Sequence, residues 1–113
     1  MAEKCRSEHC EQVDFVAWFR KKHPDVLIFA IPNGGSRGKA EAARLKKEGV
    51  TRGIPDLFIP EWCVWVEMKR VKGGSLSKDQ REVINYLNGL QAHLVIVANG
   101  FEDAKKQILE IAG

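Results

Sequence analysis

Two acidic residues occupy facing positions in a predicted β-hairpin. Residues 53–59 and 64–69 are rich in β-branched and aromatic side chains, and residues 60–62 between them have the composition of a turn. Antiparallel pairing across this turn places Asp56 directly opposite Glu67 on one face of the hairpin. Directly opposed side chains have Cβ atoms about 4.5–5.5 Å apart, and like charges there destabilise a sheet. A cation between the two carboxylates removes that repulsion, so the pair predicts a metal site.

Lys69 completes a group suited to phosphodiester hydrolysis. It follows Glu67 by two residues and therefore returns to the same face of the strand. Carboxylate oxygens are ligands that Mg²⁺ or Mn²⁺ prefers, and the backbone carbonyl of Met68 supplies a further oxygen. The metal would polarise the phosphate and lower the pKa of water, while Lys69 orients that water or neutralises charge on the phosphorane. An exposed strand with a salt bridge is the alternative for Glu67 and Lys69, but it leaves Asp56 unexplained.

The composition is that of one ordinary globular domain. The 113 residues are 44% hydrophobic and 29% charged, which is typical of a folded protein with a single core. No apolar run approaches the roughly 20 residues that span a membrane, and the first residues lack the apolar core of a signal peptide. Three cysteines, an odd number, give no disulfide framework. We therefore expect residues 1–113 to form a single cytoplasmic domain.

Basic residues lie on both sides of the acidic pair along the chain. The formal net charge of +3 is small, and its distribution is more informative than its size. The basic residues nearest the pair are Arg37, Lys39, Arg44, Lys46, Lys47 and Arg52 before it, and Arg70, Lys72, Lys78 and Arg81 after it. This distribution suits a polyanion delivered to a metal, and a solvated helix face is the alternative for any one of these residues.

The apolar patterning predicts an α/β domain in the order α-β-α-β-β-α-β-α. Helices are expected at residues 7–22, 39–48, 77–91 and 102–111, and strands at residues 26–31, 53–59, 64–69 and 94–98. The continuous apolar run of the first strand predicts that it is buried. The strands on either side of the third helix form a β-α-β crossover and should pair in parallel. With the antiparallel hairpin, this predicts a mixed four-stranded sheet flanked by helices.

Four short motifs resemble the VRR-NUC domain, within the PD-(D/E)XK nuclease superfamily. They are Pro32-Asn33-Gly34-Gly35, the segment from Gly49 to Asp56, Glu67-Met68-Lys69, and Leu76-Ser77 with Gln80. The resemblance covers most of the chain. The Val71-Lys72 pair departs from the arginine-rich motif that names the family, which bears on substrate contacts rather than catalysis. The resemblance implies a restriction-endonuclease-like fold and a metal-dependent nuclease with Asp56, Glu67 and Lys69 at its centre.

The same resemblance implies two further site residues. An acidic residue on the first helix should complete the metal site; Glu11 is the best match, because Gln12 and the apolar stripe follow it, and Glu8 lies one turn away as the second candidate. An exposed helix charge is the alternative for Glu11. Gln80 is implied to be an active-site residue that positions water or phosphate. However, Ser77 and Gln80 also have the spacing of a capping box, in which Gln80 binds the backbone at the start of a helix.

The combined expectation is a Mg²⁺- or Mn²⁺-dependent deoxyribonuclease that cleaves by in-line attack of water and leaves a 5′-phosphate. The expected nucleic-acid contacts are Asn33, Arg37, Lys39, Arg44, Arg52, Arg70 and Lys72. Asn33 and Arg37 lie in a glycine-rich loop that either grips the nucleic-acid backbone or is a plain solvent loop.

The resemblance of stand-alone members of the family to Holliday-junction resolvases implies branched DNA as substrate and a homodimer. Trp62, expected to be exposed at the hairpin tip, would contact the second copy; simple edge packing is its alternative. No membrane and no nucleotide cofactor are expected as partners. The alternative function is a non-catalytic nucleic-acid-binding module that keeps the nuclease fold, and an RNase would share the same site.

Overall fold

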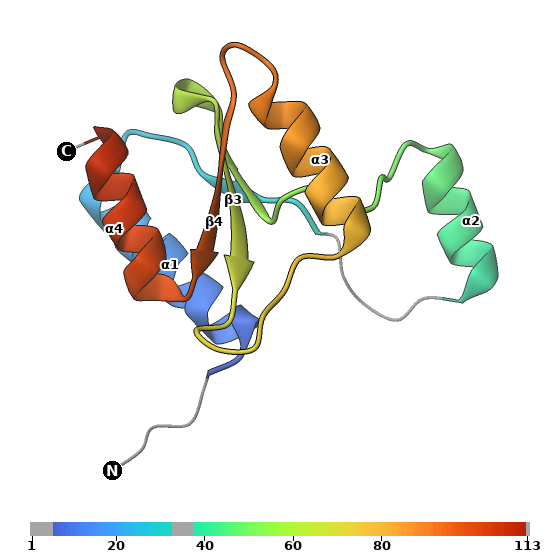
Figure 1. Ribbon diagram of the computed structural model, residues 1–113, viewed down its shortest axis with the longest axis horizontal. Helices are drawn as coiled ribbons and strands as arrows, with labels where there is room; N and C mark the ends of the chain where they lie inside the picture. Colours follow the sequence, from blue (N-terminus) through green and yellow to red (C-terminus); the bar gives the residue numbers. More distant parts are fainter. Residues whose placement is uncertain (1–5, 33–37, 113) are drawn as a thin grey trace.

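The computed structural model describes residues 6–32 and 38–112, which form a four-stranded mixed sheet with helices on both faces (Figure 1). The helices are α1 (Glu8–Lys22), α2 (Lys39–Lys47), α3 (Lys78–Asn88) and α4 (Phe101–Ala112). The strands are β1 (Phe29–Ala30), β2 (Leu57–Ile59), β3 (Val64–Lys69) and β4 (Leu94–Asn99), and a 3₁₀ turn, Pro60–Trp62, joins β2 to β3. The α/β class and the element order are those predicted from the sequence.

The strand order in the sheet is β1-β2-β3-β4. The pairs β1–β2 and β2–β3 are antiparallel, whereas β3 and β4 are parallel and are joined through α3. In the hairpin, Leu57 pairs with Val66 and Phe58 with Trp65, so the preceding residue, Asp56, comes opposite Glu67. The register predicted from side-chain alternation and the turn is therefore the observed one.

Two apolar clusters hold the helices on opposite faces of the sheet. The larger cluster lies between the sheet and α1 with α4, and the smaller one lies beneath α3. The larger cluster contains Phe15, Phe19, Leu57, Ile59, Val64, Val66, Met68 and Ile108, and the smaller contains Ile84, Leu87 and Val95. Strand β3 is thus covered on both faces, and its polar residues near the carboxyl end are buried with it.

The first predicted strand is shorter and more exposed than expected. Only Phe29–Ala30 pairs, at the edge of the sheet, and Leu27 and Phe29 are 62% and 40% exposed. Ile28, which faces the core cluster, is buried. The prediction of a buried strand at residues 26–31 was wrong because a continuous apolar run does not reveal that one face of an edge strand is left uncovered.

Trp62 is not the exposed hairpin residue that the sequence suggested. Its indole ring packs edge-on against the rings of Phe19, at 5.3 Å, and His23, at 5.0 Å between centroids. It is half-buried against the larger core cluster. The 3₁₀ turn, Pro60–Trp62, folds the side chain back onto α1, so the edge-packing alternative describes Trp62 and the interface prediction is withdrawn.

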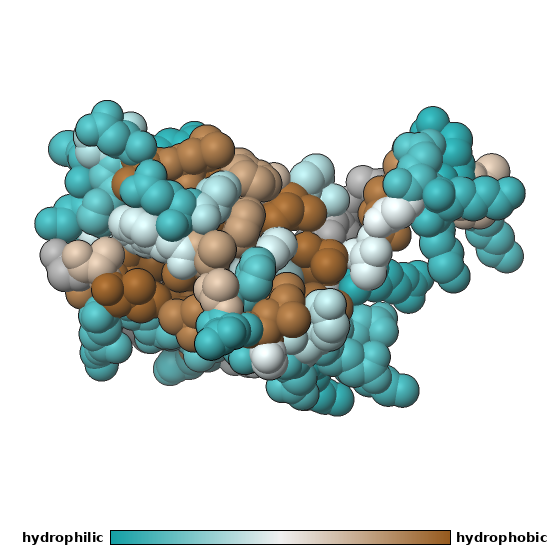
Figure 2. Space-filling model, turned by 90° about the horizontal axis from the view of Figure 1, so that it is seen from above, coloured by the Kyte–Doolittle hydropathy of each residue, from teal (hydrophilic) through white to brown (hydrophobic). Residues whose placement is uncertain are grey.

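Helix α2 stands away from the rest of the domain. It contains no buried residue, and Figure 1 shows it apart from the sheet and its covering helices. Its surface, at the right of Figure 2, is predominantly hydrophilic. Gly49, with a φ of 104°, directly follows its C-cap, Glu48. No helix in the described ranges combines the length and apolar character that a membrane span needs.

Candidate active site

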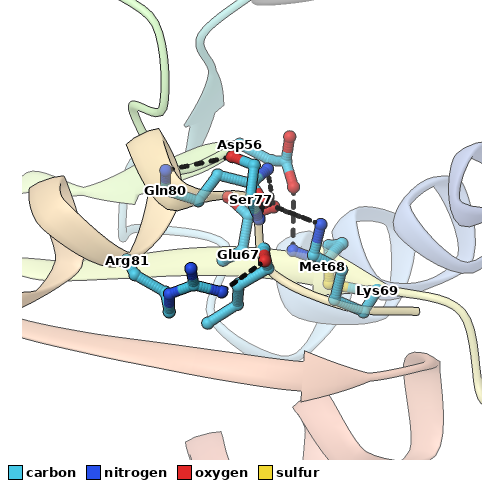
Figure 3. A network of polar contacts seen from close by, with 8 residues as sticks. Asp56, Glu67, Met68, Lys69, Ser77, Gln80 and Arg81 are labelled. Atoms are coloured by element: carbon cyan, nitrogen blue, oxygen red, sulfur yellow. Dashed lines mark hydrogen bonds and ion pairs between the residues drawn. The ribbon is translucent and has the colours of Figure 1, made fainter.

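Asp56 is fixed between two strands just before β2 begins. Its backbone carbonyl accepts a hydrogen bond from the Ile31 N–H at 2.8 Å, which extends the pairing of β1 with β2. Its side-chain Oδ2 accepts a hydrogen bond from the Met68 N–H, also at 2.8 Å. Both ends of the residue are therefore held, and the carboxyl group points to the carboxyl end of β3, where Glu67 lies opposite it (Figure 3).

Glu67 is the most strongly perturbed acid of the site. It is 1% exposed, and its Oε1 is buried without a hydrogen-bond partner in the described part of the chain. Burial, followed by the negative charge of Asp56, raises the pKa of Glu67 to about 8. Burial also raises the pKa of Asp56, against the opposing effect of the Met68 N–H bond. Two carboxyl groups are thus held together where neither can ionise easily without a compensating positive charge.

Lys69 and Gln80 close a polar network around Glu67. The Lys69 Nζ lies 3.6 Å from Glu67 Oε2 and donates a hydrogen bond to Gln80 Oε1 at 3.0 Å. The Gln80 Nε2 donates to Glu67 Oε2 at 3.1 Å. These residues come from β3 and from the first turn of α3, and their side chains converge in Figure 3.

Gln80 serves as a helix cap and as a member of this network in one conformation. Its Oε1 accepts from the Ser77 N–H at 2.9 Å, while Ser77 Oγ accepts from the Gln80 N–H at 3.1 Å, which completes a capping box. The same Oε1 binds Lys69, and the amide nitrogen binds Glu67. The two interpretations that the sequence left open are therefore compatible, and the cap fixes the side chain that faces the acids.

Gly53 brings the Asp56 segment against α3. Its φ is 85°, and a Cβ at this position would lie 2.5 Å from the backbone oxygen of Asp79. Any other residue would meet both the left-handed backbone conformation and the α3 backbone. This long-range contact sets the distance between the loop that ends at Asp56 and the helix that begins before Gln80.

We expect Gly53→Ala to lower the free energy of unfolding by about 2–4 kcal/mol, because strain and a backbone overlap add. Urea unfolding monitored by circular dichroism measures this change. Gly38→Ala is the matched control: Gly38 has a negative φ and no atom within 4 Å of the place that an alanine methyl group would take, so at most about 1 kcal/mol should be lost. Equal losses in the two variants would contradict the role given to Gly53.

Glu11 is buried, and it binds the start of α4. It is 5% exposed, so the alternative of an exposed helix charge is wrong. Its Oε1 accepts from the Phe101 N–H at 2.7 Å, and its Oε2 lies 3.6 Å from Arg6 Nε. The free N–H groups and the positive end of a helix attract such a carboxylate. One carboxylate oxygen of Glu11 is therefore bound to the start of α4 rather than directed to Asp56 and Glu67.

Glu8 is the acidic side chain of α1 whose charge reaches Asp56. After burial, which is the main cause, the negative charge of Glu8 contributes to the raised pKa of Asp56. Across residues 6–32 and 38–112, no three His, Cys, Asp or Glu side chains come together as a metal-binding group. The acidic metal ligand expected on α1, Glu11 or in second place Glu8, therefore stays a prediction.

The donor set nevertheless fits a divalent cation. Glu67 offers a buried, unbonded oxygen, and Asp56 faces it from the next strand. The backbone carbonyls of Cys63 and Lys69 accept hydrogen bonds from the β4 side of β3. Successive residues of a strand direct their backbone groups to opposite sides, so the N–H and C=O of Met68 point away from β4, and its N–H binds Asp56. Two carboxylates and one carbonyl are the hard oxygen ligands that Mg²⁺ and Mn²⁺ favour.

The predicted nucleic-acid contacts are spread over the surface around this site. Lys39 and Arg44 are exposed on α2, Arg52 is exposed on the loop before Asp56, and Arg70 and Lys72 are exposed after β3. Arg44 is 3.8 Å from Glu48 on the same helix. Asn33 and Arg37 lie outside the described residues.

Comparison with known proteins supports the architecture. Neither the family models nor the curated proteins give a significant match to this sequence. A solved structure described as a VRR_NUC domain protein superposes with a TM-score of 0.78, covering 97% of this chain and 91% of that chain. The chain has the VRR-NUC fold. At 22% identity the match establishes the fold alone, and it confirms at that level the resemblance drawn from the motifs.

Proposed function

We propose that this chain is a metal-dependent endonuclease that hydrolyses DNA phosphodiester bonds. One observation carries the proposal: Glu67 is buried with an unbonded carboxylate oxygen, the half-buried Asp56 lies opposite it, and a lysine, Lys69, lies beside it. A pair kept only for stability has no reason to place a buried acid opposite a half-buried one, because the cost of removing charge from water exceeds the benefit unless the charges are compensated. The VRR-NUC fold agrees with this activity.

Each side chain has a distinct task in the proposed reaction. Asp56, Glu67 and the Met68 carbonyl would hold Mg²⁺ or Mn²⁺, which when bound polarises the phosphate and lowers the pKa of water. Lys69 would orient the attacking water and offset negative charge on the phosphate as the oxygen attacks. Gln80 holds the Lys69 ammonium through its Oε1 and so keeps it beside the acids.

Branched DNA and a homodimer are the proposed substrate and assembly. Both follow from the resemblance to the VRR-NUC family rather than from a contact in this chain. The exposed basic residues on α2, on the loop before Asp56 and after β3 support a polyanionic substrate approached from more than one side.

The decisive experiment compares a fluorescent four-way junction with matched duplex and single-stranded DNA and with RNA, in Mg²⁺, Mn²⁺ or EDTA. Metal-dependent, paired cuts in the junction support the proposal in full. Cutting of every DNA supports the nuclease and removes the preference for junctions, and cutting of RNA alone assigns an RNase. Binding in EDTA without cutting in either metal identifies a non-catalytic nucleic-acid-binding module and overturns the proposal.

The two tasks of Gln80 can be separated by substitution. Ser77→Ala removes the hydroxyl that caps α3, and we expect it to cost about 1 kcal/mol of stability while cleavage stays within about threefold. Gln80→Glu keeps an oxygen for Ser77 and Lys69 but replaces the amide that donates to Glu67 by an oxygen. We expect cleavage to fall about 10- to 100-fold, since Glu67 then faces a second carboxylate.

Initial cleavage rates and urea unfolding of both variants measure these effects. If Gln80→Glu loses no more activity than Ser77→Ala, then Gln80 acts only as a cap.

A further inference from the structure

A row of three aromatic rings crosses the sheet beside the acidic pair. Phe29 of β1 is paired with Phe58 of β2, and Phe58 is paired with Trp65 of β3. The Phe29 and Phe58 rings meet edge to face with centroids 6.0 Å apart, and the Phe58 and Trp65 rings stack at 4.1 Å. We call these three side chains the aromatic row.

The aromatic row lies on the same face of the sheet as the proposed site. Phe58 is two residues from Asp56, and Trp65 is two residues from Glu67, so the alternation of strand side chains directs them to one face. Two residues along a strand span about 7 Å. The row is therefore the next layer of side chains along β2 and β3 from the two carboxyl groups.

The row is anchored at one end and open at the other. At the anchored end, Trp65 packs with the cluster beneath α3, and its Nε1 donates to His93 Nδ1 at 3.0 Å. At the open end, Phe29 lies on the edge strand and is 40% exposed. Phe58, between them, is half-buried. A rigid stack that ends in an exposed ring provides a surface on which a planar group can rest.

We propose that the aromatic row binds an unpaired base of the substrate, next to the phosphate held at Asp56 and Glu67. The proposed substrate class is therefore DNA with unpaired nucleotides beside the cut, and this inference rests on the nuclease function proposed above. Exposed aromatic rings bind bases that have left the helical stack, whereas bases inside a duplex have no free face to offer.

A second copy of the chain is the less suitable occupant. Stable interfaces bury about 800 Å² on each partner, and the exposed part of the row is one ring with the margin of the next. A single base matches that area. The exposed Arg52, four residues before Asp56, offers a positive charge to the phosphates that accompany the base.

Binding without cleavage tests the inference. Fluorescence anisotropy in EDTA measures the affinity of the full chain for a single-stranded oligonucleotide and for its fully paired duplex. We expect Phe29→Leu to weaken single-strand binding about 5- to 100-fold, with duplex binding changed less than about twofold. Phe29→Tyr keeps the ring and should restore the affinity. Tyr86→Leu is the control, because this exposed aromatic residue of α3 lies outside the row.

Two results overturn the inference. One is a Phe29→Leu variant that binds single strands as tightly as the unchanged protein, or that weakens both DNA forms equally. The other is a change in the mass of the Phe29→Leu protein in light scattering, which assigns the row to an interface between copies. The two proposals can fail separately. If Phe29→Leu loses single-strand binding but the unchanged protein cleaves no DNA, only the nuclease function is rejected. If the unchanged protein cleaves DNA but Phe29→Leu binds single strands normally, only the base-binding role of the aromatic row is rejected.

Discussion

Lys69→Ala is expected to reduce metal-dependent DNA cleavage by about a thousandfold or more and to leave DNA affinity in EDTA within about threefold. The Lys69 ammonium lies 3.6 Å from Glu67 and is held by Gln80, so its removal takes the positive charge from the place where charge develops during hydrolysis. The proposed contacts with the DNA backbone come from exposed basic residues elsewhere and would remain. Single-turnover cleavage with saturating enzyme measures the chemical step apart from binding.

Two further variants make this prediction specific. Asp56→Asn keeps the shape of the side chain and its acceptor for the Met68 N–H but removes the negative charge, and cleavage should fall as steeply. Lys78→Ala removes an exposed lysine of α3 that pairs only loosely with Glu82, at 3.9 Å, and should cleave normally. Circular dichroism checks that all variants are folded. Equal activity in Lys69→Ala and Lys78→Ala would remove Lys69 from the reaction.

The arrangement of the acidic pair could be predicted from the sequence because its determinants are local. A hairpin joined by a short turn has its register set by the turn and by the alternation of apolar side chains. Asp56 opposite Glu67, and Lys69 on the same face as Glu67, follow from that register alone. The parallel pairing of β3 with β4 follows similarly from the intervening helix.

The features that the sequence did not reveal depend on packing between distant segments. Glu8 and Glu11 occupy the same helix three residues apart, but among the contacts of the described residues only the position of Glu11 is set by the first N–H of α4, 90 residues later in the chain. Gly53 is identified as essential only when the α3 backbone lies against it. In the sequence, Trp62 lies in the turn between two strands, and nothing near it indicates that its ring packs against Phe19 of α1. None of these contacts has a local pattern.

The metal-free protein is expected to lose stability as the pH rises from about 5 to 8, through Glu67. The pKa of this acid is about 8 in the folded protein, against 4.5 in the unfolded chain. Below about pH 4.5 both states hold the proton, and the favourable contribution is fully present. Between these values the unfolded chain releases a proton that the folded protein keeps, so each pH unit removes on the order of 1 kcal/mol from the free energy of unfolding. Above about pH 8 that contribution is lost.

Comparison with Glu67→Gln isolates this effect, since the amide does not titrate and all other groups are shared. Urea unfolding in EDTA at pH 5, 6, 7 and 8 measures the free energy of unfolding of both proteins. The value for the unchanged protein minus that for Glu67→Gln should fall steadily as the pH rises. Glu82→Gln, an exposed change on α3, should give a constant difference. Added Mg²⁺ should stabilise the unchanged protein more at pH 8 than at pH 5, because a cation needs the ionised carboxyl group. Parallel curves for the unchanged protein and Glu67→Gln would mean that Glu67 is ionised without a cation, and the argument that its burial marks a metal site would fail.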